Sequence, residues 1–519
     1  MADQFVGPDR PKQSVGFHTI ERASLVEILG LPDPVFVGAG DPWRQLAYVE
    51  TYVRELGCET VVLEQHYIDR DHMEDHSVFY SKNLRQYRNS CQRLHFFSLG
   101  KKKLEAEIRR LRTLALPAAA STDAFMRACE EFSRSHYIGF AVIKPLPGCP
   151  VGRTLLRCLP ADSGKGHRRH LDCASDAEAH LLGVRLTVSG LPFQQQDLGV
   201  SACATTALWT SLQRARQLEQ FGSVTPAQIT IRASQFALPF GRSMPSEGLS
   251  LDQMCQAVHS LGYSPTLYRI EGSSEWFDLS RALLQSSVSS GISPVVIMRL
   301  PGEITRHAVA VAGTAIADPI QPPAPSEMRH SSADLVALYI HDDRFGPYLK
   351  AEIANRKNNF LLRLSLRNQD VPRTEEWVLT HILIPIHAKI RLSFRGVYTA
   401  GLKIVCEVQA FAEARLGVEN PAVSWSSRIV RSHSYIESLL RDKRTAPLVD
   451  RLCRTVPLPR YVGVLHVEAG SLDPFDVLLD TTSTERNLNC PALVRFGNSH
   501  KSSGLYQFIA RRYQCEVFD

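Results

Sequence analysis

The stretch QQQDLGVSACATTALW, residues 194–209, passes from a polar loop into a helix, and its single cysteine stands at the transition. Residues from Ala204 to about Leu218 favour a helix, so Cys203 is expected in the first helical turn. Unpaired backbone N–H groups and the helix dipole stabilise negative charge there, which can make a cysteine a nucleophile. The rest of the sequence decides whether Cys203 has the partners that such chemistry needs.

The bulk properties are those of a globular protein. The chain has 519 residues, 44% hydrophobic and 22% charged, with a net charge of +6. These values are typical of a soluble protein with about two to four domains. The N-terminus has no secretory signal pattern, and no stretch reaches the roughly 18 apolar residues of a membrane span. We therefore expect a cytoplasmic protein without a membrane partner.

The basic run GKKKLEAEIRRLRTLAL, residues 100–116, predicts an amphipathic helix. Leu104, Ile108, Leu111 and Leu114 share one face of it, and the cations lie opposite. A solvated face is the favoured interpretation, and contact with nucleic acid is the alternative. Charge alone does not predict a nucleic-acid partner.

The twelve cysteines are scattered singly and form no CxxC pair, a pattern that excludes a zinc ribbon and a small disulfide scaffold. Two polar stretches hold residues of the metal-ligand type, namely His72 and His76 in the first, and His167, His170, Cys173 and His180 in the second. Neither stretch has an established metal-binding order. We expect a polar surface or domain contact from the first, a mobile loop from the second, and no metal or other cofactor.

The order of predicted elements divides the chain into three parts, an N-terminal α+β domain (1–190), a central domain (191–352) and a C-terminal α+β domain (353–519). In the central part a helix starts near Cys203, and a second follows Ser250, which forms a capping box with Gln253. Strands follow at 293–301, 306–316 and 334–343, with a proline-rich loop between the last two. Helices packed on an antiparallel sheet give an α+β class.

Three residues outside the helix complete a constellation around Cys203. His307 begins an apolar strand, where an ionisable side chain is unusual for packing alone, so it is the candidate base. Asp342, at the end of the next strand, is the candidate that orients the imidazole, and Asp318 is its competitor. Gln196, seven residues before Cys203, is the candidate donor to an oxyanion.

These residues carry a resemblance. CATTAL, residues 203–208, resembles the Cys-Gly-Pro-Thr-Ala-Leu stretch of papain-like cysteine peptidases of the C39, or bacteriocin-processing, type. Residues 248–263, 294–313 and 338–348 are similar to the helix, the histidine strand and the aspartate strand of that family. The resemblance covers about residues 194–350, and it implies a papain-like fold with Cys203 as nucleophile, His307 as base, Asp342 as orienting residue and Gln196 as oxyanion donor.

The sequence therefore predicts a cysteine peptidase, a thiol hydrolase that cleaves a peptide or isopeptide bond of a protein or peptide substrate. The flanking domains, which carry no chemical signature, are expected to recognise the substrate or a protein partner. Two alternatives use the same residues differently. The thiol could serve an acyltransferase or a non-peptide amidase, or the papain-like domain could be an inactive scaffold for interactions.

Overall fold

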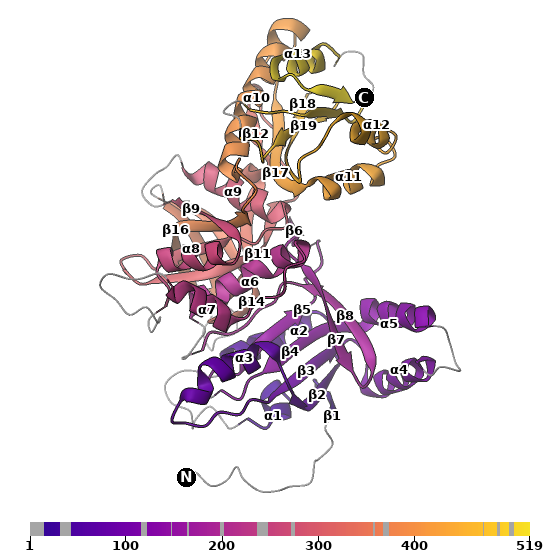
Figure 1. Ribbon diagram of the computed structural model, residues 1–519, viewed down its shortest axis with the longest axis vertical. Coiled ribbons are helices and arrows are strands. Elements are labelled where there is room, and N and C mark those ends of the chain that lie inside the picture. The colour runs from indigo at the N-terminus through magenta and orange to yellow at the C-terminus, as the bar shows by residue number, and fades with distance from the viewer. Residues whose placement is uncertain are drawn as a thin grey trace.

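The computed structural model contains three main β-sheets, which follow one another along the long axis of the molecule (Figure 1). It describes residues 15–31, 43–115, 122–146, 148–162, 164, 166–197, 202–235, 248–270, 276–356, 359–366, 373–470, 472–484, 488–497 and 503–518. Helices and strands occur in every part, so the chain is an α+β protein with several domains, as the sequence predicts. None of the helices in these ranges is long and apolar enough to span a bilayer.

The N-terminal unit is built on a five-stranded antiparallel meander, β1 to β5 in chain order. The strands are β1 (Val15–Thr19), β2 (Thr60–Tyr67), β3 (Cys91–Phe97), β4 (Tyr137–Ile143) and β5 (Val151–Leu156). The helices are α1 (Leu25–Leu29), α2 (Arg44–Glu55), α3 (Arg70–Val78), α4 (Lys101–Leu114) and α5 (Thr122–His136). A hairpin of β7 (Ser175–Leu181) and β8 (Val184–Gly190) completes the unit.

Alternation along the strands gives this meander two apolar faces. Val61 and Leu63 belong to the main hydrophobic core together with residues of α1 and α2, whereas Val62 belongs to a second cluster with α4 and α5. The basic run forms α4 as predicted. Its buried residues are Leu104, Ile108 and Leu111. The meander is thus covered by helices on both faces.

The central sheet closes on itself. Its order is β10-β11-β13-β14-β15-β16, and β16 also pairs with β10, so six antiparallel strands form a barrel. They are β10 (Val295–Arg299), β11 (Arg306–Ala317), β13 (Leu335–Asp342), β14 (Gly346–Arg356), β15 (Asn359–Leu366) and β16 (Arg373–His387). Two further strands extend it, β9 (Tyr263–Arg269) beside β16 and β6 (His167–His170) beside β11.

Helix α6 (Cys203–Leu218) packs against the outside of this barrel, together with α7 (Pro226–Ser234) and α8 (Leu251–Ser260). On β11, Ala308 and Ala310 face α6, and these small side chains allow a close approach. Val309 and Val311 belong to the main core instead. The capping box of Ser250 at α8 is present as predicted.

The C-terminal unit is a six-stranded sheet with helices on both sides (Figure 1). Its strands are β12 (Met328–His330), β17 (Val423–Arg431), β18 (Tyr461–Ala469), β19 (Phe475–Asp480), β20 (Ala492–Arg495) and β21 (Glu516–Phe518). Its helices are α10 (Phe394–Leu416), α11 (Ser432–Arg441), α12 (Leu448–Thr455) and α13 (Ser503–Tyr513), and α9 (Trp276–Ser289) of the central part packs against β17. Strand β12 comes from the segment predicted to be a proline-rich loop.

The three units share elements and one core. The predicted boundary at residue 352 falls inside β14, and the barrel continues through β16 to His387. Strand β6, in the polar segment that was expected to be a mobile loop, pairs with β11 of the barrel. A single apolar cluster runs from Ile20 in the N-terminal unit to Cys515 near the C-terminus. The units are therefore packed against each other through a continuous interior.

Candidate functional site

Cys203 is the first residue of α6, directly after Ala202 at the N-cap. Among the described residues no side chain caps this helix, so its first-turn N–H groups are not taken by one. Cys203 is half-buried. Thr206, one helical turn later, donates a hydrogen bond of 2.9 Å from its Oγ1 to the Cys203 carbonyl. The cysteine therefore stands at the positive end of a long helix, most of whose residues are buried.

His307 and Asp342 are brought together because they lie on neighbouring antiparallel strands. His307 is the second residue of β11, and Asp342 is the last residue of β13. In an antiparallel pair the start of one strand lies beside the end of the other. His307 Nε2 lies 3.1 Å from Asp342 Oδ1, so the imidazole N–H donates a hydrogen bond to the carboxylate. Asp318, the competitor, forms an ion pair with Arg168 instead.

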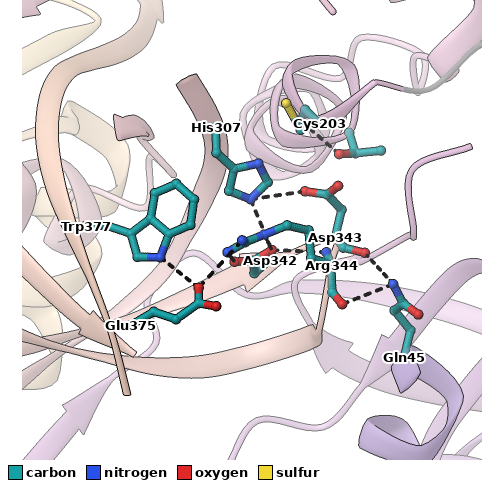
Figure 2. Close-up of polar contacts among 9 residues, drawn as sticks. Gln45, Cys203, His307, Asp342, Asp343, Arg344, Glu375 and Trp377 are labelled. Carbon is teal, nitrogen blue, oxygen red and sulfur yellow. Dashed lines mark hydrogen bonds and ion pairs between the residues drawn. The ribbon is translucent and has the colours of Figure 1, made fainter. Parts of the chain in front are cut away.

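The imidazole lies between Asp342 and the nucleophile candidate. Figure 2 shows the start of α6, with Cys203, on the side of the His307 ring away from Asp342. A hydrogen bond with the Cys203 thiol is among the contacts that raise the pKa of His307. With Nε2 directed to Asp342, Nδ1 is the nitrogen left for the thiol. The structure thus brings together three of the four residues selected from sequence.

Arg344 fixes the charge of Asp342 (Figure 2). Its Nη2 donates to Oδ2 at 2.7 Å, and its Nε and backbone N–H donate to Oδ1 at 3.1 and 3.0 Å. The guanidinium stacks on Trp377, with 4.5 Å to the ring centroid. The Trp377 indole in turn donates to Glu375 and lies 5.8 Å from the His307 ring. Asp342 is therefore held rigidly and in its ionised form.

The pKa directions agree with this arrangement. Burial alone would lower the pKa of His307, but the charges of Asp342 and Asp343, with the hydrogen bonds to Asp342 and Cys203, raise it to about 10. Burial would raise the pKa of Asp342, yet His307 and Arg344 hold it well below its usual range. The site therefore favours an imidazolium next to the thiol.

Asp343 is a second carboxylate at the same imidazole. Its Oδ1 is 3.6 Å from His307 Nε2, and its side chain is almost completely buried. Its Oδ2 is buried without a hydrogen-bond partner among the described residues. Burial, with the neighbouring charge of Asp342, raises the pKa of Asp343 to about 6 against the opposing charges of His307 and Arg344.

The three glutamines before Cys203 have different environments. Gln196, the predicted oxyanion donor, is exposed. Gln195 is buried and bonds to Val151 and Gly148, which fixes it to the edge of β5. Gln194 is 3% exposed, and its Nε2 has no hydrogen-bond partner among the described residues. A buried, unused amide donor so close in sequence to Cys203 makes Gln194 the stronger candidate.

Two hydrogen bonds connect the segment that carries Gln194 to the elements that carry Cys203 and Asp342. The carbonyl of Pro192 accepts hydrogen bonds from Thr210 of α6 at 3.0 Å and from His341 of β13 at 3.2 Å. Strand β13 also carries Asp342, and α6 starts at Cys203. The segment is therefore held between the helix that begins at Cys203 and the strand that ends at Asp342.

The N-terminal unit fixes the site from the other side. Lys144, after β4, forms a buried ion pair with Asp197, with 3.2 Å between Nζ and Oδ2. Gln45 of α2 donates to the carbonyls of Asp343 and Arg344, both at 3.1 Å (Figure 2). Gln45 thus holds the backbone next to Asp342, and Lys144 holds the side chain of Asp197 in the segment that precedes α6, so the N-terminal unit is part of the site's framework.

Gly346 allows a third contact of this kind. A Cβ added to Gly346 would lie 2.1 Å from the ring of Tyr48 on α2. Only glycine permits this approach of α2 to the turn after Asp343. The turn is therefore packed as well as hydrogen-bonded against the N-terminal unit.

The weaker metal candidates are not assembled. His72 and His76 lie on α3 as expected, but each Nε2 bonds to a backbone carbonyl. Asp75 on the same helix accepts a hydrogen bond of 3.1 Å from the N–H of Ala227 at the start of α7, so the stretch forms the expected domain contact. Cys173 is buried in the core.

One group of possible metal ligands occurs in the described ranges, and it is His307 with Asp342 and Asp343. Arg344 already occupies both oxygens of Asp342, so a metal ion would have to displace a guanidinium. The two carboxylates therefore fit the protonated imidazole of His307 better than they fit a metal ion.

Several site residues were missed from sequence. Arg344 and Asp343 stand in the HDDRFGPY run that singled out Asp342, and a charged triplet after an apolar strand is a usable local signal. Lys144, Gln45 and Trp377 lie far away in the chain and have no local signal. The sequence matches no model of a known protein family and no curated protein.

Proposed function

We propose that this chain is a cysteine hydrolase of the papain-like kind, a peptidase that cleaves a peptide or isopeptide bond. The observation that carries the proposal is the alignment of Cys203, His307 and Asp342, with the cysteine at a helix start and the histidine between the other two. A nucleophile, a base and a residue that orients the base are what covalent acyl transfer needs. A nucleophile helix packed on an antiparallel barrel that carries the base supports the papain-like assignment.

The mechanism follows from the contacts. The Cys203 proton moves to His307 Nδ1, and the imidazolium is held at Nε2 by Asp342. The thiolate attacks the amide carbonyl carbon, and the leaving amine takes the proton from Nδ1 as the C–N bond breaks. Water then adds to the thioester with His307 as base, and the C–S bond breaks to release the acid and restore the thiol.

The tetrahedral intermediate requires donors to its oxyanion. Backbone N–H groups in the first turn of α6 supply one set. The side-chain amide of Gln194 supplies the second donor in our proposal, because its Nε2 is buried and unused whereas Gln196 is exposed. The oxyanion role thus moves two residues from the position that the family resemblance implied.

The substrate is a protein or peptide in this proposal, and the two flanking units select it. The N-terminal unit contacts the triad through Gln45 and the preceding segment through Lys144. These contacts support the proposal that this unit helps to select the substrate. We expect specificity to change when this unit is altered.

Thiol reactivity gives the first test. Iodoacetamide at pH 6, with mass mapping of all twelve cysteines, should modify Cys203 faster than the exposed Cys406 and Cys453. His307→Ala should abolish this preference. Cys255, which is also half-buried and lies within helix α8, is the matched control, and burial raises its pKa. Equal alkylation rates for Cys203 and Cys255 in the unmutated chain would show that Cys203 is not activated as a thiolate and would contradict the proposal.

Turnover gives the second test. A library of peptides and isopeptide-linked peptides is incubated with the unmutated chain and with Cys203→Ala, and new termini are read by mass spectrometry. Cleavage that drops on the order of 10⁴-fold in the variant supports the peptidase. A reactive Cys203 whose acyl group passes to an added amine rather than to water would indicate an acyltransferase, and unreactive Cys203 an interaction scaffold.

A further inference from the structure

The proposed mechanism uses one carboxylate at His307, but the structure places two there. Asp342 Oδ1 lies 3.1 Å and Asp343 Oδ1 3.6 Å from the same Nε2. One hydrogen on Nε2 satisfies one short hydrogen bond, and Asp342 has the better distance. Asp343 is thus a buried charge beside the imidazole that orientation of the ring does not require.

The two carboxylates are compensated differently. Asp342 accepts three hydrogen bonds from Arg344 in addition to the one from His307. Asp343 accepts no hydrogen bond from Arg344; its own backbone N–H donates to its carboxylate, and its Oδ2 is buried without a hydrogen-bond partner among the described residues. A buried carboxylate is costly to ionise unless a cation lies close to it.

The charged groups that face Asp343 come from two elements. They are His307 on β11, and Asp342 and Arg344 in its own turn. Arg344 directs its nitrogens to Asp342, and Gln45 on α2 bonds only to the backbone carbonyl of Asp343. The protonated ring of His307 is therefore the cation nearest to the Asp343 carboxylate, and the two groups titrate as a coupled pair.

From this geometry we infer that Asp343 is a positioning residue that controls the charge of His307. When Asp343 is ionised, its carboxylate stabilises the imidazolium and with it the thiolate of Cys203. When Asp343 takes up a proton, Asp342 alone holds the ring, and the thiolate becomes less populated. The pair makes the site's reactivity sensitive to mildly acidic conditions.

The pH range follows from burial. Because burial raises the pKa of Asp343 to about 6, the change falls between about pH 5 and 7, where an ordinary aspartate is fully ionised. Asp342 cannot give this response, since His307 and Arg344 keep its pKa well below its usual range. A second, titrating carboxylate thus adds a response that one fixed carboxylate lacks.

The test compares Asp343→Asn with the unmutated chain. The rate of Cys203 alkylation by iodoacetamide is measured from pH 4 to 10, and the ¹⁵N resonances of His307 are followed over the same range. The unmutated chain should show an inflection near pH 6 in both curves. In Asp343→Asn this inflection should disappear, and the His307 pKa should fall by about one, which lowers alkylation at neutral pH about tenfold.

Two controls separate a charge effect from a loss of shape. Asp343→Glu keeps the charge and should restore the inflection at least in part. Asp342→Asn should lower reactivity and keep an inflection, shifted to lower pH because the charge of Asp342 no longer raises the pKa of Asp343. If Asp343→Asn does not fold, the His307 titration in the unmutated chain still tests the inference. A His307 titration in it with a single step and no inflection near pH 6 would overturn the inference.

The role of Asp343 in reactivity rests on the proposed function, but its coupling to His307 does not. A chain that cleaves no peptide and yet shows the coupled titration would contradict the proposed function alone. A chain that cleaves peptides through Cys203, with a His307 titration that Asp343→Asn leaves unchanged, would contradict the inference alone.

Discussion

At the scale of single residues, the sharpest distinction lies between Gln194 and Gln196. Gln194→Ala removes a buried amide donor, so we expect kcat to fall about 10²- to 10³-fold, as for other oxyanion donors. Gln196→Ala removes an exposed side chain and should change kcat less than twofold. The measurement is steady-state cleavage of a peptide found in the library. Equal losses in both variants would place the oxyanion donor elsewhere.

The histidine makes a second prediction at this scale, which concerns stability and pH. The pKa of His307 is raised to about 10, against about 6.5 in an unfolded chain. A base with a raised pKa contributes stability that is complete below pH 6.5 and is lost as the pH rises toward 10. The free energy of unfolding should therefore fall between pH 7 and 10 by about 3 to 4 kcal/mol more in the unmutated chain than in His307→Gln.

Urea unfolding at pH 7, 8, 9 and 10 measures this difference, because the tyrosines, the lysines and the cysteines other than Cys203 have the same surroundings in both chains. Asp343 titrates lower, near pH 6, and does not disturb this range. Parallel slopes for the two chains would show that His307 is not held as an imidazolium.

At the scale of elements, local signals predicted the triad helix and strands well. The start of α6 at Cys203 and the capping box of Ser250 depend on neighbours within four residues, which a sequence displays directly. The apolar strands β11 and β13, which are separated in the chain by the segment with β12, pair with each other and place His307 beside Asp342. Contacts across long separations, such as Gln45 with Asp343, leave no such pattern.

The candidate oxyanion donor could not be chosen from residues close to Cys203 in sequence. Spacing from Cys203 favoured Gln196, but burial depends on the edge of β5, where Phe193 pairs with Thr154 and where Gln194 and Gln195 are buried while Gln196 is exposed. Gln195 bonds to β5, whereas Asp197 turns in to meet Lys144. None of these partners lies near Cys203 in sequence.

The buried ion pair gives a prediction for the segment that leads into α6. Lys144→Met removes the cation that pairs with the buried Asp197 carboxylate, so we expect a loss of about 3 to 5 kcal/mol of unfolding free energy. Lys144→Met with Asp197→Leu removes both charges and should recover most of it. Urea unfolding of the three chains measures the effect. A single variant as stable as the unmutated chain would mean that the pair does not hold this segment.

At the scale of the whole molecule, the barrel explains why the predicted boundaries could not be read from the chain. Strands β15 and β16 look like the start of a new domain, but β16 closes the barrel by pairing with β10. Strand β6 reaches the barrel from a segment of the N-terminal part, and β12 leaves the central part to join the C-terminal sheet. Sheet closure is a property of pairing between distant strands, so hydrophobic patterning alone does not reveal it.

Barrel closure predicts how fragments behave. A fragment of residues 191–352 lacks β6, β15 and β16, so β10 and β14 each present an open edge and the apolar interior is exposed. We expect it to aggregate or to unfold without a cooperative transition, as followed by circular dichroism during a urea titration. A fragment of residues 144–392, which restores the closed barrel, should unfold more cooperatively, although it lacks the contacts of α2 and α3. Cooperative unfolding of the shorter fragment would show that the central part folds without closure and that the site needs neither neighbour.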